Sequence, residues 1–328
     1  MRHRVFLYFV LIFIVLSLMG GSVLSTYKQF VAEGPLQVRS EILIQPGESL
    51  RKIAQKLYDE SVIESPTVFE IGLRAMGQGL DIKAGEYSIP RHASMKMVAH
   101  ILTSGQTYVR RLVIPEGLTS AQVIATMDNA KGLMGQVIQT PKNGTLLPDT
   151  YHYSYGDTKE GMLSRMKNAM TTTLDELWAG RDTSISLKNK KEALVMASIV
   201  EKETSIDKER AHIASVFYNR IKKGIRLQSD PTVIYAVTDG QVDQKKRVLY
   251  EDLKFKSPYN TYVVYGLPPQ PIANPGRASL YAVLHPMKTN DLYFVADGKG
   301  GHVFSETYSE HRKNVKNWRQ VSKKVKAQ

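Results

Sequence analysis

A long apolar run near the N-terminus places the strongest constraint on what this chain can form. The run, Val5 to Leu24, follows directly after a basic stretch at residues 1–4. Twenty helical residues at about 1.5 Å each cross a hydrocarbon core of roughly 30 Å, whereas the apolar part of a cleaved signal peptide has only about 7–15 residues. Basic residues before such a run favour a cytoplasmic N-terminus. The sequence therefore predicts a retained transmembrane signal anchor over 5–25, with residues 1–4 in the cytoplasm.

The composition limits what the rest of the chain can bind. The 328 residues carry a formal net charge of +13 and are 42% hydrophobic, which allows about two ordinary domains and predicts an anionic partner. Nucleic acid is not expected on the far side of the membrane. The anionic partner that we expect is therefore an envelope polymer or the outer leaflet of the membrane. The absence of cysteine excludes disulfides, thiol catalysis and cysteine-ligated zinc. The eight histidines form no His-x-x-x-His pair, so we expect neither a metal nor another cofactor.

The pattern after the anchor predicts an α+β protein in two parts. A polar connector at 26–40 leads to a small α+β region at 41–135, in which Ser49 caps a helix after a strand and a Gly47 turn. A helix-rich domain at 145–328 follows, with a short β-hairpin. Its expected helices are 159–178, 188–204, 207–222, 230–237 and 277–284, its hairpin joins 292–296 to 302–304, and a last helix begins near 307.

The first region resembles a LysM carbohydrate-binding module. The resemblance rests on the strand near residue 41, on Gly47 to Leu50 and on Ala84 to Pro90. It implies a LysM-like domain that binds glycan. A generic βααβ unit without any glycan contact would give the same pattern, and the sequence leaves both interpretations open.

The segment Ala193 to Thr204 carries the strongest chemical signal. A helix that is apolar on all sides is buried, and here it runs directly into Glu201 and Glu203. Positions two apart lie about 200° apart around a helix, so the two carboxylates cannot form a close pair. A carboxyl at the end of a buried helix loses hydration, which favours the protonated form that a general acid needs. A structural ion pair of Glu201 with Lys202, Arg220 or Arg226 is the alternative.

Two further segments contain candidate substrate-binding residues. In the first, Asp230 is expected to be the N-cap of a helix, and Gln228 has no structural explanation. The second is a loop at 257–276 that is rich in proline, asparagine and tyrosine, with Tyr259, Asn260 and Tyr262 as its candidates. Aromatic rings mixed with amides suit sugar faces and N-acetyl groups, although they also suit ordinary surface turns.

Taken together, these segments resemble the endolytic peptidoglycan transglycosylases of the MltG (YceG-like) family over nearly the whole chain. The segments that carry the resemblance are Leu147–Tyr151, Ala197–Thr204, Val216–Arg220, Leu227–Tyr235, Tyr259–Tyr262, Gly266–Pro269, Ala273–Gly276 and Leu292–Gly298. The resemblance implies a single-pass inner-membrane protein with a periplasmic catalytic domain. Such an enzyme cuts nascent glycan strands at the MurNAc–GlcNAc bond and works with the peptidoglycan synthases of cell elongation. It also implies that Glu201 is the catalytic glutamate.

The implied chemistry needs only one carboxyl group. Most glycosidases use two carboxyl groups that flank the bond. A lytic transglycosylase instead uses the sugar's own 6-hydroxyl as nucleophile and leaves a 1,6-anhydro-MurNAc end. Three alternatives stay open on the residues alone: a lysozyme-like hydrolase assisted by Asp230 or Glu203, a non-catalytic glycan-binding scaffold for wall synthases, and a cytosolic enzyme whose N-terminus only resembles an anchor.

Overall fold

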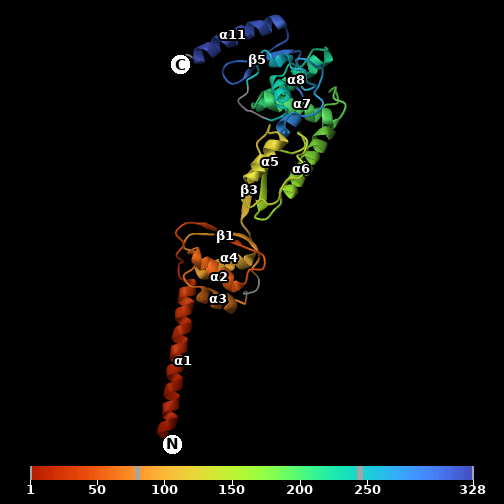
Figure 1. Ribbon diagram of the computed structural model, residues 1–328. Coiled ribbons are helices and arrows are strands. Elements are labelled where there is room, and N and C mark those ends of the chain that lie inside the picture. Colours follow the sequence, from red (N-terminus) through yellow and green to blue (C-terminus); the bar gives the residue numbers. More distant parts are fainter. Residues whose placement is uncertain (1, 78–81, 242–246, 327–328) are drawn as a thin grey trace. The chain divides into compact units, whose positions relative to one another are not determined.

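The computed structural model describes residues 2–77, 82–241 and 247–326, and the chain divides into two compact units (Figure 1). The first unit contains Met1–Arg110 and His152–Gly156, and the second contains Arg111–Tyr151 and Asp157–Gln328. Residues 111–135, which the sequence grouped with the first region, therefore make most of their contacts within the second unit. The mixed α+β class is confirmed.

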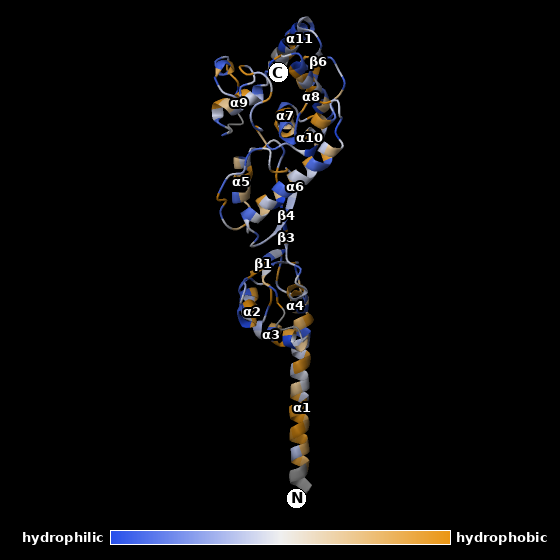
Figure 2. Ribbon diagram, turned by 90° about the vertical axis from the view of Figure 1, so that its right-hand side faces the viewer, coloured by the Kyte–Doolittle hydropathy of each residue, from blue (hydrophilic) through white to orange (hydrophobic). Residues whose placement is uncertain are grey.

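The first unit begins with one long helix, α1 (Arg2–Val31). Its segment Phe6–Val31 has a mean hydropathy of 2.5 and is long and apolar enough to cross a membrane. Figure 2 shows the apolar colour along most of this helix. The helix continues into the stretch expected to be a connector because its last turns pack against the unit. Phe30 is buried there, against the bare backbone of Gly72.

The rest of the first unit is a small α+β fold. Its elements are β1 (Ser40–Ile44), α2 (Leu50–Asp59), α3 (Pro66–Ala75), β2 (Gly85–Ile89) and α4 (Met95–Ser104). The strands β1 and β2 pair antiparallel, with Ile42 opposite Tyr87. The helices cover a core of aliphatic and aromatic side chains that includes both of these residues. The expected cap is confirmed, since the Ser49 hydroxyl accepts a hydrogen bond from the Lys52 N–H.

A second strand–turn–helix corner, after the one formed by β1 and α2, follows along the chain. The strand β3 (Val109–Val113) forms a two-stranded sheet with β4 (Thr150–Ser154), and α5 (Ser120–Asp128) lies between them in the chain. Gly117 has φ 76°, close to the 78° of Gly47, and Thr119 closes a capping box with Gln122. The turn glycine and the hydroxyl cap before the helix are thus the same in this corner as in the one formed by β1 and α2.

The second unit is built around α7 (Lys190–Glu203), whose apolar part is buried on all sides. It packs against α8 (Asp207–Lys222), α10 (Arg277–Leu284), α9 (Asp230–Thr238) and α6 (Lys159–Ala179). A short 3₁₀ helix, Asp252–Lys254, packs on α9. The hairpin of β5 (Tyr293–Ala296) and β6 (His302–Ser305) carries the last helix, α11 (Tyr308–Lys326). The helices and the hairpin predicted for this part of the chain are confirmed.

The start of α9 differs from the prediction. The residue in the cap position is Ser229, in an extended conformation, and Asp230 is the first helical residue. The Ser229 hydroxyl donates to Glu203 and caps nothing. Asp230 accepts instead from the Tyr262 hydroxyl at 2.7 Å. The prediction that Asp230 is an N-cap was therefore wrong, because tertiary contacts engage both side chains.

Candidate functional site

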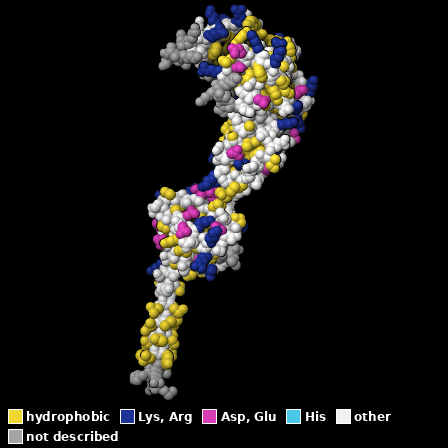
Figure 3. Space-filling model, viewed as in Figure 1, with side chains coloured by type: hydrophobic (Ala, Val, Ile, Leu, Met, Phe, Trp, Pro, Cys, Tyr) yellow, Lys and Arg dark blue, Asp and Glu magenta, His cyan; other side chains and the backbone are white. Residues whose placement is uncertain are grey.

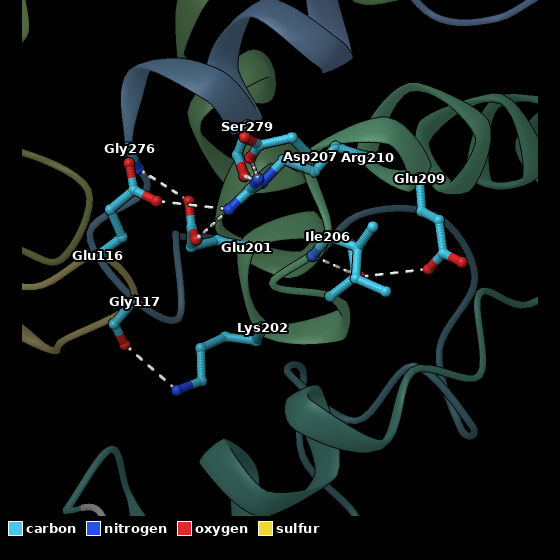
Figure 4. A network of polar contacts seen from close by, with 11 residues as sticks. Glu116, Gly117, Glu201, Lys202, Ile206, Asp207, Glu209, Arg210, Gly276 and Ser279 are labelled. Atoms are coloured by element: carbon cyan, nitrogen blue, oxygen red, sulfur yellow. Dashed lines mark hydrogen bonds and ion pairs between the residues drawn. The ribbon is translucent and has the colours of Figure 1, made fainter. Parts of the chain in front are cut away.

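The C-terminal end of α7 directs its two glutamates into different surroundings. Glu201 lies in a closed network of polar contacts, with only 5% of its side chain exposed (Figure 4). Its Oε2 accepts from the Gly276 N–H at 2.9 Å, and its Oε1 is 3.4 Å from Nη2 of Arg210. Both carboxylate oxygens of Glu201 therefore already have partners within the protein.

Arg210 is the centre of this network. Its Nη2 is 3.4 Å from Oε2 of Glu116, its Nε donates to the Ser279 hydroxyl at 3.0 Å, and its other terminal nitrogen binds Asp207. Burial and the neighbouring charge of Glu201 raise the pKa of Glu116. One buried guanidinium thus joins three carboxylates and α10, which is the arrangement of a structural ion cluster.

Glu203 instead faces an open cavity of about 250 Å³. Its carboxylate accepts a hydrogen bond from the Ser229 hydroxyl. Burial raises the pKa of Glu203 to about 7, and the negative charge of Asp230 acts in the same direction. The Ser229 hydrogen bond and the positive charges of His302 and Arg220 oppose this shift without cancelling it. Glu203 is therefore still partly protonated near neutral pH, where an ordinary glutamate is ionised.

The walls of the Glu203 cavity are polar and well connected. They are formed by Arg220, Leu227, Gln228, Asp230, Tyr262, Phe294 and His311 together with Glu203 itself. Arg220 donates to Oε1 of Gln228 at 3.2 Å and to the Leu227 carbonyl at 2.9 Å. These bonds hold the backbone of Gln228 in its left-handed conformation, with φ 54°.

The structure brings together three of the five predicted substrate-binding residues. Gln228, Asp230 and Tyr262 line the Glu203 cavity. Tyr259 packs on the Tyr235 ring, with 4.8 Å between centroids. Asn260 is fully buried, and its amide donates to carbonyls of the loop that includes the short 3₁₀ helix, an arrangement that shapes this loop.

The sequence analysis missed several residues of this cavity. Arg220 lies in Val216–Arg220, one of the segments that carry the family resemblance, so the sequence did contain a signal for a role of Arg220 in the site. His311 had no such signal, because it lies in the tail helix α11 and reaches the cavity only through tertiary packing. Its ring stacks on Tyr293, and its Nδ1 is buried without a hydrogen-bond partner among the described residues. Burial and the charge of Arg220 lower the pKa of His311, which favours a neutral ring.

A second cavity, of about 560 Å³, is lined by residues of α7 and α9 and by the loop before α5. Lys202 and Pro231 line it, whereas their chain neighbours Glu203 and Asp230 line the first cavity. The Gly117 loop and Tyr235 complete the second cavity. In the described part of the chain, no group of three His, Asp or Glu side chains is arranged to hold a metal ion.

Comparisons with known proteins agree with the family resemblance seen in the sequence. The model of the YceG-like family matches residues 42–317. An endolytic murein transglycosylase from Bacillus subtilis is 34% identical, over 83% of this chain and 82% of that protein. One from Streptococcus pneumoniae is 27% identical, and this chain spans only 57% of its length. A crystal structure of a YceG-like protein from Listeria monocytogenes matches 84% of this chain and 98% of that one, with 30% identity and a TM-score of 0.54.

Proposed function

The chain belongs to the YceG-like family, and from this premise we propose that it is an endolytic murein transglycosylase. The relative from Bacillus subtilis carries that name and is matched over most of both chains, which supports the same activity here. The substrate is then the glycan strand of peptidoglycan, cut at an internal MurNAc–GlcNAc bond.

Glu203 is the general acid in this proposal. The observation that carries it is the position of the Glu203 carboxyl group in a cavity lined also by Gln228, Asp230 and Tyr262, where burial raises its pKa to about 7. A general acid at neutral pH needs both a retained proton and access to substrate. Glu201, which the family resemblance favoured, has its two oxygens engaged by Arg210 and Gly276. The geometry therefore supports Glu203 as the general acid.

The reaction needs one proton that moves twice. Glu203 donates its proton to the oxygen that leaves C1 of MurNAc, and the C1–O bond breaks. The 6-hydroxyl of the same sugar then bonds to C1 and returns its proton to Glu203, so the enzyme ends in its starting state. The products are a 1,6-anhydro-MurNAc end and a free GlcNAc hydroxyl, and no water is consumed.

The Glu203 substitution tests this assignment directly. Glu203→Gln keeps the shape of the side chain but removes the transferable proton, and we expect strand cleavage to fall by about 10²–10⁴-fold or more. Glu201→Gln is the matched control, because it alters the Arg210 network on the same helix. It should lower the melting temperature and retain measurable cleavage. An active Glu203→Gln together with a folded but inactive Glu201→Gln would return the catalytic role to Glu201.

The mass of the products separates the proposed reaction from hydrolysis. An anhydro end is lighter by one water than the reducing end that a lysozyme-like hydrolase leaves. Digestion of purified murein by the wild-type chain should therefore yield anhydro ends. Reducing ends would support a hydrolase in which Asp230 assists, and full function in cells that carry Glu203→Gln and Glu201→Gln together would support a non-catalytic scaffold.

The membrane-anchored organisation is also part of the proposal. The apolar segment Phe6–Val31 supports a single-pass anchor, and the basic N-terminus supports a periplasmic location for the chain that follows the anchor. The βααβ order of the first unit supports a LysM-like role in holding glycan near the site, and the peptidoglycan synthases of elongation are the expected protein partners. A topology reporter fused after Gln328 tests the orientation. A cytoplasmic signal from this reporter would exclude the periplasmic location.

A further inference from the structure

We propose that a groove between the outer end of α1 and helix α3 binds a phospholipid of the bilayer. This inference rests on the proposed membrane anchor and is independent of the transglycosylase chemistry. The groove has a volume of about 540 Å³ and lies entirely within the first unit. That volume is in the range of sites that hold small ligands.

Two helix faces with the same spacing form the groove. From α1 come Ser22, Val23, Thr26, Tyr27 and Phe30, and from α3 and its C-cap come Ile71, Gly72, Ala75 and Met76. Residues spaced i, i+1, i+4 and i+5 share one side of a helix, so each helix presents a continuous stripe. Most of these side chains are apolar. The Thr26 hydroxyl, which is one of the few polar groups, already donates to the Ser22 carbonyl at 2.9 Å.

The groove remains open because its lining is only partly covered by protein. Phe30 is buried against Gly72, which fixes how closely the two helices approach. Val23 and Ile71, by contrast, are 70% and 52% exposed. Apolar surface that the protein leaves uncovered marks a place where another apolar group binds. Figure 3 shows apolar side chains gathered over the protruding part of α1.

The position of the groove along α1 identifies the occupant. A helix that enters the hydrocarbon core at Phe6 leaves it about twenty residues later, near Thr26. The groove starts one turn earlier, at Ser22, and ends at Phe30. It therefore spans the boundary between acyl chains and head groups, where a lipid can place its chain between the helices without leaving the bilayer.

One basic side chain gives the groove a polar end. Lys96 of α4 lines it, and in the part of the chain that the structure describes Lys96 forms no ion pair. A lysine at the membrane surface attracts anionic lipid. Together, the apolar stripes and this ammonium group match a phospholipid with a net negative head group, such as phosphatidylglycerol.

Retention of lipid by the intact protein tests the proposal. The full chain is reconstituted in nanodiscs that contain phosphatidylglycerol and phosphatidylcholine, released into detergent, and weighed by native mass spectrometry. We expect one phosphatidylglycerol to be retained per chain. Lys96→Ala should lower this retention roughly fivefold, and Lys96→Arg should preserve it. Lys52→Ala, which removes an exposed charge elsewhere in the same unit, is the matched control and should change nothing.

A second variant tests the apolar part of the groove. Ala75 is exposed, so Ala75→Phe fills the groove without disturbing the core and should abolish retention. Ala125→Phe, at an exposed helical alanine of α5, should not. Equal retention of both lipids by every variant would overturn the proposal. So would a stable dimer that Ala75→Phe dissociates, because the groove would then be an interface between two copies. Failure of the chain to enter nanodiscs would instead refute the membrane anchor. Cleavage of murein by the chain in detergent tests the transglycosylase activity separately.

Discussion

The environment of Glu203 makes the stability of the protein depend on pH. Its pKa in the folded state is raised from 4.5 to about 7, chiefly by burial. The folded chain therefore holds this proton between pH 4.5 and 7, while the unfolded chain has released it. The stabilisation is fully present below about pH 4.5 and is lost as the pH rises through 7.

Comparison with Glu203→Gln isolates this effect, because the amide does not titrate. We expect the variant to gain stability relative to the wild type between pH 5 and 7.5, by on the order of 1–3 kcal/mol. Denaturant unfolding at several pH values measures the difference. A constant difference across this range would show that Glu203 has an ordinary pKa, and the proposed acid would lose its main support.

At the scale of elements, one buried amide connects segments that are far apart in the chain. Oδ1 of Asn274 accepts from the N–H groups of Gly144 and Leu146, at 2.8 and 3.1 Å. Its amide nitrogen donates to the Leu118 carbonyl at 3.0 Å and is 3.3 Å from the Ser120 hydroxyl. The side chain thus joins the loop before α10 to the start of α5 and to the loop that follows α5.

Asn274→Ala should destabilise the second unit strongly. The substitution leaves several buried donors and acceptors without partners, and each costs about 1–3 kcal/mol, so we expect a total loss of more than about 2 kcal/mol. Thermal unfolding measures it. Asn129→Ala is the control, because the Asn129 amide is exposed at the end of α5 and makes one local bond. Equal effects of the two changes would mean that the loops are held by other contacts.

At the scale of the whole molecule, the net charge of +13 is concentrated in part on the last helix. In α11, Arg312, Lys313, Lys316 and Arg319 are exposed, while Val315 and Trp318 are partly buried where the helix packs on the β5–β6 hairpin. The other lysines of this tail, Lys323, Lys324 and Lys326, lie outside the residues whose side chains the structure describes. Two roles suit these exposed basic residues: they bind anionic stem peptides or lipid head groups, or they keep the helix solvated.

Neutralising these four exposed residues to glutamine distinguishes the two roles. If the helix binds the anionic polymer, sedimentation of the full chain with murein should fall several-fold at low salt. The difference should shrink near 1 M salt, where the screening length is only about 3 Å. Replacing these four residues leaves the Trp318 contact intact, so the melting temperature should be unaffected. Unchanged sedimentation at low salt would leave the helix with a structural role alone.

The sequence by itself determined the elements of this protein and its family. Hydrophobic spacing, capping serines and glycine turns act within a few residues, so the helices from α6 to α10, the β5–β6 hairpin and the Ser49 cap could all be predicted. The apolar run 5–25 and the buried helix that ends in two glutamates could also be predicted from the sequence. Helical periodicity also separated Glu201 from Glu203 correctly, because 3.6 residues per turn is a local property.

Only the tertiary structure decided what each glutamate faces. Arg210 and Gly276 contact Glu201, whereas Ser229, Tyr262 and His311 come from three separate segments of the chain to surround Glu203. Burial and charge depend on such distant neighbours, so the raised pKa of Glu203 has no local signature. For the same reason Asp230 looked like a helix cap in the sequence. In the fold its carboxylate binds Tyr262, and the Ser229 hydroxyl that could have capped α9 binds Glu203 instead.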